Sequence, residues 1–283
     1  MFLSVFDMFK IGIGPSSSHT MGPMVASGMF LDLLRASLFE PAGVQARLHG
    51  SLAFTGVGHA TDRAVLLGLA GFQPSTFDAT KGEAALEAMK QEKVVHPAGL
   101  PSLRLDPASD ILFDYGPALP GHANGMVFMA TDAQGDVILQ QSYYSIGGGF
   151  VVTEEEMASG TTTGDIAPYP YEFNSANELL DLCAKHGKSI AEVKRENELS
   201  RRSVTELEKG LAEIWVVMNA CINRGLERDG ILPGGLNVKR RAKGIYDALL
   251  AERGLNMSAP HTINDWMSVY AMAVNEENAA GGQ

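Results

Sequence analysis

Three short, glycine-bracketed segments each place a histidine among small or hydroxyl-bearing residues. The histidines are His19, His59 and His122, in the sequences GPSSSHTMGP, GVGHATD and PGHANG. An imidazole can be neutral near pH 7, so each histidine could take up or release a proton during a reaction. Loops of this kind beside strand and helix ends predict one site assembled on a rigid scaffold. Three unrelated surface histidines are the alternative interpretation.

The segment from Gly12 to Pro23 predicts the start of a helix. Serines, His19 and a threonine precede an apolar stretch with helical periodicity, residues 24–34, and Ser and Thr are preferred N-caps. A helix N-terminus presents free N–H groups and a partial positive charge. With hydroxyl groups and an imidazole beside it, this helix start predicts a receptor for a small carboxylate or phosphate. A serine-rich cap on an ordinary helix is the alternative.

Two more segments are rich in glycine. Residues 144–149, YSIGGG, lie between two expected strands, where the glycines predict a bulge or a close backbone approach and would supply N–H donors. Residues 230–241, GILPGGLNVKRR, predict a turn followed by a helix that Asn237 caps. Lys239 and Arg240 in the first turn would oppose the helix dipole, so we expect them to face an anion. A solvated basic turn is the alternative.

Composition excludes several classes of protein. The 283 residues are 45% apolar and 19% charged, as expected for a globular protein with a full core. The net charge is −11, whereas a nucleic-acid-binding protein carries a cluster of basic residues. No apolar run is long enough to span a membrane, and the N-terminus has no signal pattern. The two cysteines do not make a disulfide framework. We therefore expect a cytoplasmic protein without nucleic-acid or membrane partners.

Periodicity predicts an α+β fold in which a mixed domain precedes an all-α domain. We place the α+β domain at residues 1–155, a Gly/Thr/Pro-rich linker at 156–175 and the start of the all-α domain at 176–283. Residues 207, 211, 214, 215, 218 and 222 form the expected core stripe of the longest helix. We expect helices at 20–38, 64–70, 82–91, 176–186, 189–199, 203–228, 237–253 and 261–278, and strands at 44–51, 111–115, 126–131, 137–146 and 150–153.

Five motifs in order resemble the iron–sulfur L-serine dehydratases (L-serine ammonia-lyases) of bacteria. They are SSSHTxGP, HGSLAFTGxGHATD, HANGM, YSIGGGF and LPGGLNVKRR, and the resemblance runs from about residue 2 to the last residue. The first domain also resembles the allosteric substrate-binding domain of some phosphoglycerate dehydrogenases. The resemblance implies deamination of L-serine to pyruvate and ammonia, in amino-acid catabolism, and we expect a homodimer.

The same resemblance implies a [4Fe–4S] cluster in which one iron acts as a Lewis acid on the substrate hydroxyl. A base removes the Cα proton, water leaves, and the enamine tautomerises and hydrolyses. His59 is the candidate base, and His122 would line the entrance or assist proton transfer. The candidate substrate-binding residues are Ser16, Ser17, Ser18, His19, Thr20, Thr61, Asp62, Asn124, Ser145, Gly147, Gly148, Asn237, Lys239 and Arg240.

The cysteines depart from the family pattern. A cluster of this family needs three thiolates, whereas Cys183 and Cys221 are isolated and match no cluster-ligand motif. We therefore expect no metal ligand in this chain. The sequence also ends in a glycine-rich stretch directly after an expected helix. Together these features predict the N-terminal portion of a longer enzyme, which by itself neither holds a cluster nor turns over.

Two other functions are weighed against this one. Pyridoxal-phosphate dehydratases also use a Phe-Lys dipeptide and a glycine run, which Phe9-Lys10 and Gly147–Gly149 offer, but the repeated βα units of that fold are missing. A non-catalytic serine-binding module or regulatory subunit is the other alternative. A Rossmann site is excluded because the Gly-x-Gly pairs of this sequence lack the third glycine of the dinucleotide-binding motif. A P-loop is excluded because no GK[ST] occurs.

Overall fold

The computed structural model describes residues 3–159, 168–233, 237–252 and 260–282. The chain divides into two compact units, which we call the helical unit (residues 1–10 and 162–219) and the sheet unit (residues 11–161 and 220–283). This division differs from the linear split predicted from sequence. The first ten residues are grouped with helices far along the chain, and the last helices are grouped with the sheet. The prediction of a mixed α+β fold with a helical C-terminal region is confirmed.

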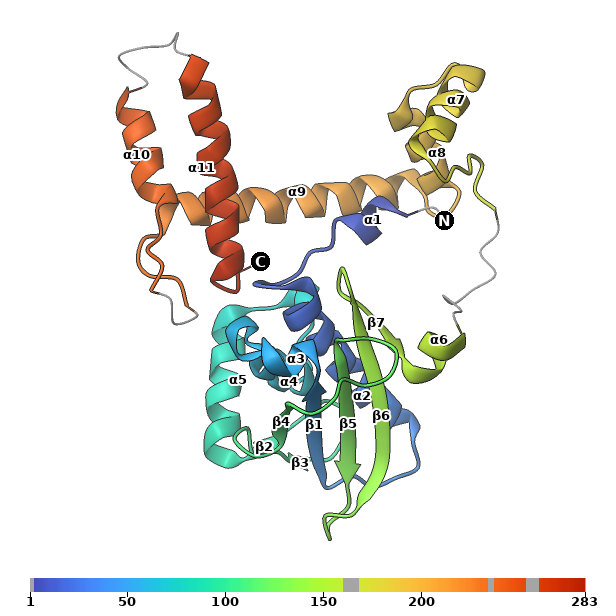
Figure 1. The fold of residues 1–283 in the computed structure, drawn as a ribbon, viewed down its shortest axis with the longest axis vertical. Helices are drawn as coiled ribbons and strands as arrows, with labels where there is room; N and C mark the ends of the chain where they lie inside the picture. Colours follow the sequence, from blue (N-terminus) through green and yellow to red (C-terminus); the bar gives the residue numbers. More distant parts are fainter. Residues whose placement is uncertain (1–2, 160–167, 234–236, 253–259, 283) are drawn as a thin grey trace. The chain divides into compact units, whose positions relative to one another are not determined.

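The sheet unit is built on a mixed sheet that has seven strands among the described residues (Figure 1). The strand order is β2-β3-β1-β5-β6-β7, and β4 pairs with β1. Strand β1 runs parallel to β4 and antiparallel to β5, and β5, β6 and β7 follow one another as antiparallel neighbours. The strands are β1 Gly43–His49, β2 Val94–Val95, β3 Leu103–Arg104, β4 Ile111–Asp114, β5 Gly125–Thr131, β6 Val137–Gly147 and β7 Phe150–Thr153.

Helix α2 packs its apolar stripe on the sheet, and α4 packs on α2. The Phe30 ring of α2 stacks on Phe128 of β5 at 5.4 Å between centroids. A Cβ on Gly68 of α4 would lie 2.4 Å from the Met24 carbonyl oxygen, so glycine permits the two helices to approach closely. The helical elements before the linker in this unit are η1 Ser17–Met21 (a π-helix), α2 Gly22–Ala36, α3 Ser51–Phe54, η2 Val57–His59, α4 Thr61–Leu69, η3 Pro74–Thr76, α5 Ala79–Glu92 and α6 Glu154–Ser159.

Helices α10 (Ala242–Glu252) and α11 (Pro260–Ala279) form a second, smaller core with the end of α9 (Val204–Glu227), which begins in the helical unit. This core contains Leu226, Ala242, Leu249, Val269 and Ala273. Beside it, the buried Glu277 carboxylate accepts hydrogen bonds from Arg240, Arg224 and Arg228 at 2.8, 3.1 and 3.4 Å. A carboxylate that is completely removed from water needs partners of this kind, so these contacts hold the ends of α9 and α11 together.

The predicted start of the helix after residue 236 is wrong. Helix α10 begins at Ala242, and Asn237 lies before it with a left-handed φ of 52°. The cap is the Glu276 carboxylate of α11, which accepts from the backbone N–H groups of Arg241 and Ala242 at 2.7 and 3.4 Å. Lys239 therefore lies in an extended segment, where it bridges Ile231, and not in a first helical turn.

The helical unit contains α1 Val5–Met8, α7 Ala176–His186, α8 Ile190–Leu199 and the first part of α9. The N-terminal arm, residues 3–8, packs among these helices. The Ser4 hydroxyl and the Val5 N–H donate to the buried Glu198 carboxylate at 2.9 and 2.7 Å. The Phe6 ring lies so close to Gly210 that a Cβ there would be 2.5 Å away. The arm is thus an integral part of this unit.

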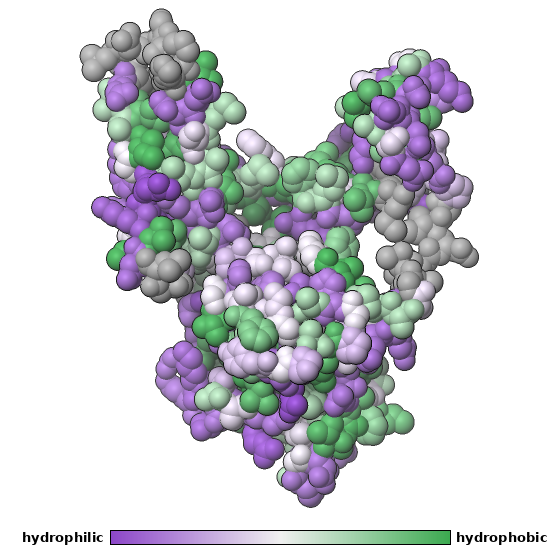
Figure 2. Space-filling model, viewed as in Figure 1, coloured by the Kyte–Doolittle hydropathy of each residue, from purple (hydrophilic) through white to green (hydrophobic). Residues whose placement is uncertain are grey.

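The expected core stripe of the longest helix is only partly buried. Leu207 is 3% exposed, whereas Trp215 is 61% exposed and Met218 40%. Helix α11 likewise exposes Ile263 and Met267. Figure 2 shows hydrophobic residues on the visible face of α9. The described ranges contain no helix that is long and apolar enough to cross a membrane.

Candidate active site

The serine-rich segment predicted to start a helix does so through η1. Ser16 is its N-cap, and the Ser16 hydroxyl accepts from the His19 N–H at 3.2 Å. The hydroxyls of Ser16 and Ser18 lie 3.4 Å apart. Because the first N–H groups of a helix have no partner within it, this end of η1 and α2 presents both N–H and O–H donors. Such a set of donors suits a small carboxylate.

The structure brings His19 and His59 together. Their ring centroids are 4.8 Å apart and their planes are tilted by 36°. The Thr20 hydroxyl of η1 also donates to the His59 carbonyl oxygen at 3.0 Å, and Thr20 is buried. Two segments forty residues apart are therefore joined by a ring contact between side chains and by a hydrogen bond from a side chain to the backbone.

The His59 ring is fixed by its own backbone neighbourhood. Its Nδ1 lies 2.9 Å from the Thr55 carbonyl oxygen. A carbonyl oxygen can only accept, so Nδ1 carries the proton and a neutral ring presents its lone pair at Nε2. His59 is half-buried on the short helix η2. This arrangement would suit a general base, because the Thr55 carbonyl sets the tautomer of the ring.

His19 has a hydroxyl partner on each ring nitrogen. Nδ1 lies 2.8 Å from the Ser18 oxygen, and Nε2 lies 3.0 Å from the Ser51 oxygen. Burial and, to a smaller extent, the neighbouring His59 lower the pKa of His19, while the hydrogen bond with Ser51 opposes this shift. The lowered pKa favours the neutral form of the His19 ring near pH 7.

The third histidine segment is connected to strand β6. His122 Nδ1 accepts from the Asn124 N–H at 3.1 Å. The Asn124 side-chain amide donates to the Ser145 carbonyl oxygen, and the Ser145 N–H donates to the Asn124 carbonyl oxygen, both at 3.0 Å. Asn124 therefore orients the segment that carries His122.

Ser145 and Thr61 are fully buried hydroxyl residues. Within the described part of the chain, neither side-chain oxygen has a hydrogen-bond partner. A Cβ on Gly22 would lie 2.0 Å from the Ser145 oxygen, so this hydroxyl packs directly on the start of α2. Thr61 is the first residue of α4 and is followed by the half-buried Asp62.

The glycine run after Ser145 forms the predicted irregularity. The register between β6 and β7 shifts between Ser145 and Gly147. Gly147 and Gly148 have left-handed φ angles of 94° and 59°, which glycine adopts without strain. The two residues thus make the turn into β7.

Of the three basic-segment candidates, Arg240 already has a partner. It is 8% exposed, and its guanidinium binds Glu277. Asn237 and Lys239 are exposed. No described contact links these three residues to the histidine segments, so their role in binding substrate stays a prediction.

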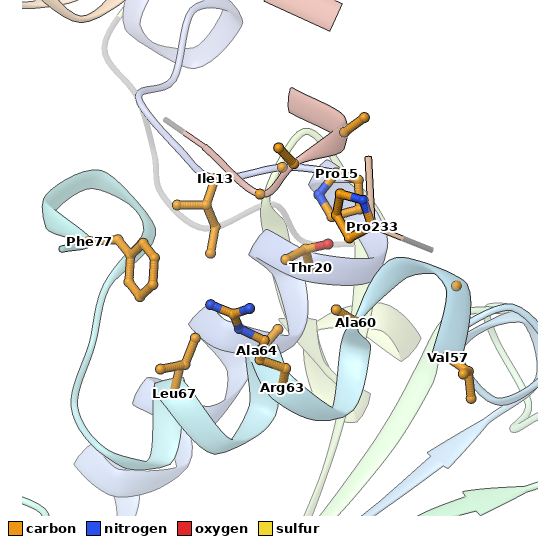
Figure 3. A pocket seen from close by; sticks show the side chains of 15 residues that line it. Ile13, Pro15, Thr20, Val57, Ala60, Arg63, Ala64, Leu67, Phe77 and Pro233 are labelled. Atoms are coloured by element: carbon orange, nitrogen blue, oxygen red, sulfur yellow. The ribbon is translucent and has the colours of Figure 1, made fainter. Parts of the chain in front are cut away.

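A cavity of about 130 Å³ is lined in part by residues that neighbour His19 and His59 in the sequence (Figure 3). Its lining includes Gly58 and Ala60, which flank His59 in the sequence, and Thr20, which follows His19. Figure 3 shows the Arg63 guanidinium directed toward Phe77 within this lining. Arg63 also pairs with Glu83 at 2.6 Å. The cavity therefore combines mostly apolar walls with one cationic group.

Two family models match the chain. The serine dehydratase beta chain model matches residues 4–156, and the serine dehydratase alpha chain model matches residues 185–283. The chain belongs to the serine dehydratase family. This confirms the family predicted from the five motifs.

Curated relatives of this serine dehydratase chain are similar over its whole length. It is 45% identical to L-serine dehydratase of Streptomyces coelicolor over 285 residues, covering 100% of this chain and 62% of the relative. It is 42% identical to L-serine dehydratase TdcG of Escherichia coli over 284 residues, covering 99% of this chain and 62% of the relative. It is 42% identical to L-serine dehydratase of Mycobacterium tuberculosis over 289 residues, covering 100% and 61%. The chain thus spans about three fifths of the length of these relatives.

The side chains of this serine dehydratase chain do not fit a [4Fe–4S] cluster by themselves. Cluster irons are held by thiolates, and the chain has two cysteines. Burial raises the pKa of the Cys221 thiol, which disfavours the thiolate. Among the described residues, no group of three or more His, Cys, Asp or Glu side chains is placed to hold a metal ion.

Three residues with contacts to the histidines or the cavity, Ser51, Thr55 and Arg63, were not predicted from the sequence. Ser51 and Thr55 lie inside the quoted motif HGSLAFTG, but their contacts with the imidazoles depend on the one-turn helix α3. Arg63 follows Asp62 directly, and only the packing of α4 shows that it reaches the cavity.

Proposed function

We propose that this chain carries the substrate-binding and proton-transfer part of an L-serine ammonia-lyase, which converts L-serine to pyruvate and ammonia. The observation that carries the proposal is the contact between His19 and His59 beside the hydroxyl-rich start of η1. The relatives' names, L-serine dehydratase, supply the substrate and the reaction class. Since the chain spans about 62% of their length, the reaction is proposed for the complete enzyme.

His59 is the proposed base. Its Nδ1 donates to Thr55, so Nε2 can accept the Cα proton of the bound amino acid. The electron pair of the broken C–H bond forms the Cα–Cβ double bond as the Cβ–O bond breaks. The hydroxyl group takes up one proton, equivalent to the one that His59 accepted, and leaves as water. The resulting aminoacrylate tautomerises to an imine, which water hydrolyses to pyruvate and ammonia.

The substrate carboxylate is proposed to bind at the start of η1. The hydroxyls of Ser16, Ser17 and Ser18 and the free N–H groups of this helix start are the proposed donors. Thr20 and His19 hold η1 against the His59 segment and would keep the carboxylate close to the base. Asn124, Ser145, Gly147 and Gly148 are proposed to shape the opposite wall, with His122 at the entrance. Thr61, Asp62, Asn237, Lys239 and Arg240 remain proposed contacts.

A [4Fe–4S] cluster remains a proposal for the complete enzyme. Its three thiolates exceed the two cysteines of this chain, so further ligands would have to be supplied from outside these residues. The work proposed for this chain is therefore binding, orientation and proton transfer at His59 Nε2.

Titration of the isotopically labelled chain with L-serine tests the proposal. We expect chemical-shift changes at residues 16–20 and around His59, and weaker ones with D-serine. Release of pyruvate by the complete enzyme, after anaerobic reconstitution with iron and sulfide, tests the reaction. L-Serine that perturbs neither segment would refute the proposed binding site.

A serine-binding module without catalysis is the second candidate, and the shortage of cysteines favours it for this chain alone. It predicts binding of L-serine without pyruvate release even in the reconstituted complete protein. A homodimer and a cytoplasmic location are further proposals, which sedimentation and cell fractionation would test.

A further inference from the structure

The one-turn helix α3 contacts all three histidine segments. It follows β1 directly through Gly50, whose φ is 55°. A Cβ on Gly50 would lie 2.4 Å from the Ala123 carbonyl oxygen. The Ser51 N–H donates to that same oxygen at 2.8 Å. The start of α3 is therefore pressed against the residue that follows His122.

The two ends of α3 bind the two neighbouring imidazoles. Ser51, its first residue, binds His19 Nε2 through its hydroxyl at 3.0 Å. Thr55, its C-cap, accepts from His59 Nδ1 through its carbonyl oxygen at 2.9 Å. Ser51 and Thr55 are themselves joined, because the Ser51 carbonyl oxygen accepts from the Thr55 N–H at 3.0 Å and from its hydroxyl at 2.8 Å. One hydrogen-bonded turn thus sets the distance between the groups that bind the two rings.

We propose that Ser51 is a positioning residue of the active site, which through α3 holds His19 against His59 and ties both to the segment that carries His122. A hydroxyl can donate or accept, so Ser51 keeps its bond to His19 in either tautomer of that ring. His19 then remains beside the His59 ring, whose Nε2 stays directed away from the Thr55 carbonyl. This inference rests on the proposed function in treating His59 as the base.

The test compares three substitutions. Ser51→Ala removes the hydroxyl, Ser51→Thr keeps a hydroxyl on the same backbone, and Ser37→Ala is the matched control. Ser37 also uses its hydroxyl for one hydrogen bond, to the Leu34 carbonyl at 2.8 Å, at the end of α2. Ring-nitrogen NMR of the labelled chain reports the tautomer of each histidine, and ring-to-ring proton contacts report how close the two rings lie.

In the wild-type chain we expect a single His59 tautomer with the proton on Nδ1 and proton contacts between the His19 and His59 rings. Ser51→Ala should abolish those contacts and shift the His19 Nε2 signal, while Ser51→Thr and Ser37→Ala keep both. A wild-type spectrum without the contacts overturns the proposal, even if Ser51→Ala does not fold. Unchanged ring signals in a folded Ser51→Ala protein, or equal changes in Ser37→Ala, also overturn it.

The complete enzyme supplies a second readout. A base that is displaced by about 1 Å loses roughly 10²-fold in rate. Ser51→Ala should therefore lower kcat by about 10- to 100-fold with little change in KM, and Ser51→Thr should restore most of it. If the NMR results hold but the complete enzyme deaminates no serine, the proposed function fails and the positioning role stands. If Ser51→Ala leaves kcat unchanged in an active enzyme, the positioning role fails.

Discussion

The imidazole rings of His19 and His59 lie 4.8 Å apart, and a different kind of group fixes each of them. Hydroxyls hold both nitrogens of His19, whereas a backbone carbonyl holds Nδ1 of His59. Burial lowers the pKa of His19, and the neighbouring His59 lowers it further. We propose that His59 accepts the substrate proton while the His19 ring beside it stays neutral.

Replacing His59 should strongly slow proton abstraction. In the complete enzyme, His59→Ala is expected to lower kcat by about 10²- to 10⁴-fold, because positioned general bases contribute this much. Exchange of the Cα proton of L-serine with deuterium from the solvent measures this step directly. His96→Ala is a suitable control, since His96 is exposed and bonded to Ser102. Equal exchange rates in wild type and His59→Ala would show that another residue is the base.

Acidification should destabilise the chain through His19 and His49. Burial is the main cause that lowers the pKa of each, with Asp114 opposing the shift and Arg47 adding to it at His49. The unfolded state therefore binds protons more readily, and stability is lost as the pH falls below about 6.5 toward the lowered values. We expect the urea concentration at half-unfolding to decrease when the pH is lowered from 7.5 to 5.5. The decrease should be smaller in a His19→Gln variant. A pH dependence that His19→Gln leaves unaltered would contradict the assignment to this ring.

The contact between Gly22 and Ser145 should not tolerate a methyl group. An added Cβ would lie 2.0 Å from the buried Ser145 oxygen, so Gly22→Ala should cost about 1–3 kcal/mol of unfolding free energy. Ser145→Gly in the same chain should recover part of this loss. Gly28→Ala in the same helix is the control, because nothing lies within 4 Å of the new Cβ. It should stabilise by about 0.5–1 kcal/mol, since alanine is the better helix former. Urea unfolding of the four proteins measures these effects, and similar midpoints for both alanine variants would contradict the prediction.

Removing the Glu277 carboxylate should strongly destabilise the sheet unit. Glu277 is fully buried and binds three arginines, so Glu277→Ala leaves the buried Arg240 charge without its partner. Breaking a buried ion pair from one side costs about 3–5 kcal/mol. Thermal unfolding measures the loss, with the exposed Glu213→Ala as the control. A loss below about 1 kcal/mol, the value of a surface pair, would show that water screens the cluster.

Periodicity in the sequence predicted most elements because it reports local preferences. Strands such as β5 and helices such as α2 and α8 lie where alternating or helical apolar patterns placed them. The burial of α9 was predicted less well. A stripe such as that containing Leu207, Trp215 and Met218 shows that one face of a helix is apolar, but it does not show what covers that face.

The sequence predicted which segments contribute to the candidate site, but it did not predict which of their residues contact one another. The shared character of the histidine segments indicated that they converge, and the structure places His19 against His59. The capping role of Asn237 was wrong because the actual cap, Glu276, lies far along the chain on another helix. Ser51 was missed for a similar reason: its role depends on α3, which is too short to produce a periodic pattern.

The N-terminal arm interlocks the two halves of the sequence. Its residues fold against Glu198 and Gly210, although they precede the sheet in the chain. In the opposite direction, the Asn278 side chain donates to the Pro15 carbonyl and the Gly14 N–H donates to Gly282. If the backbone were severed between Ser159 and Pro168, each fragment would still hold a piece of the other, so the two polypeptides could remain associated without a covalent tether.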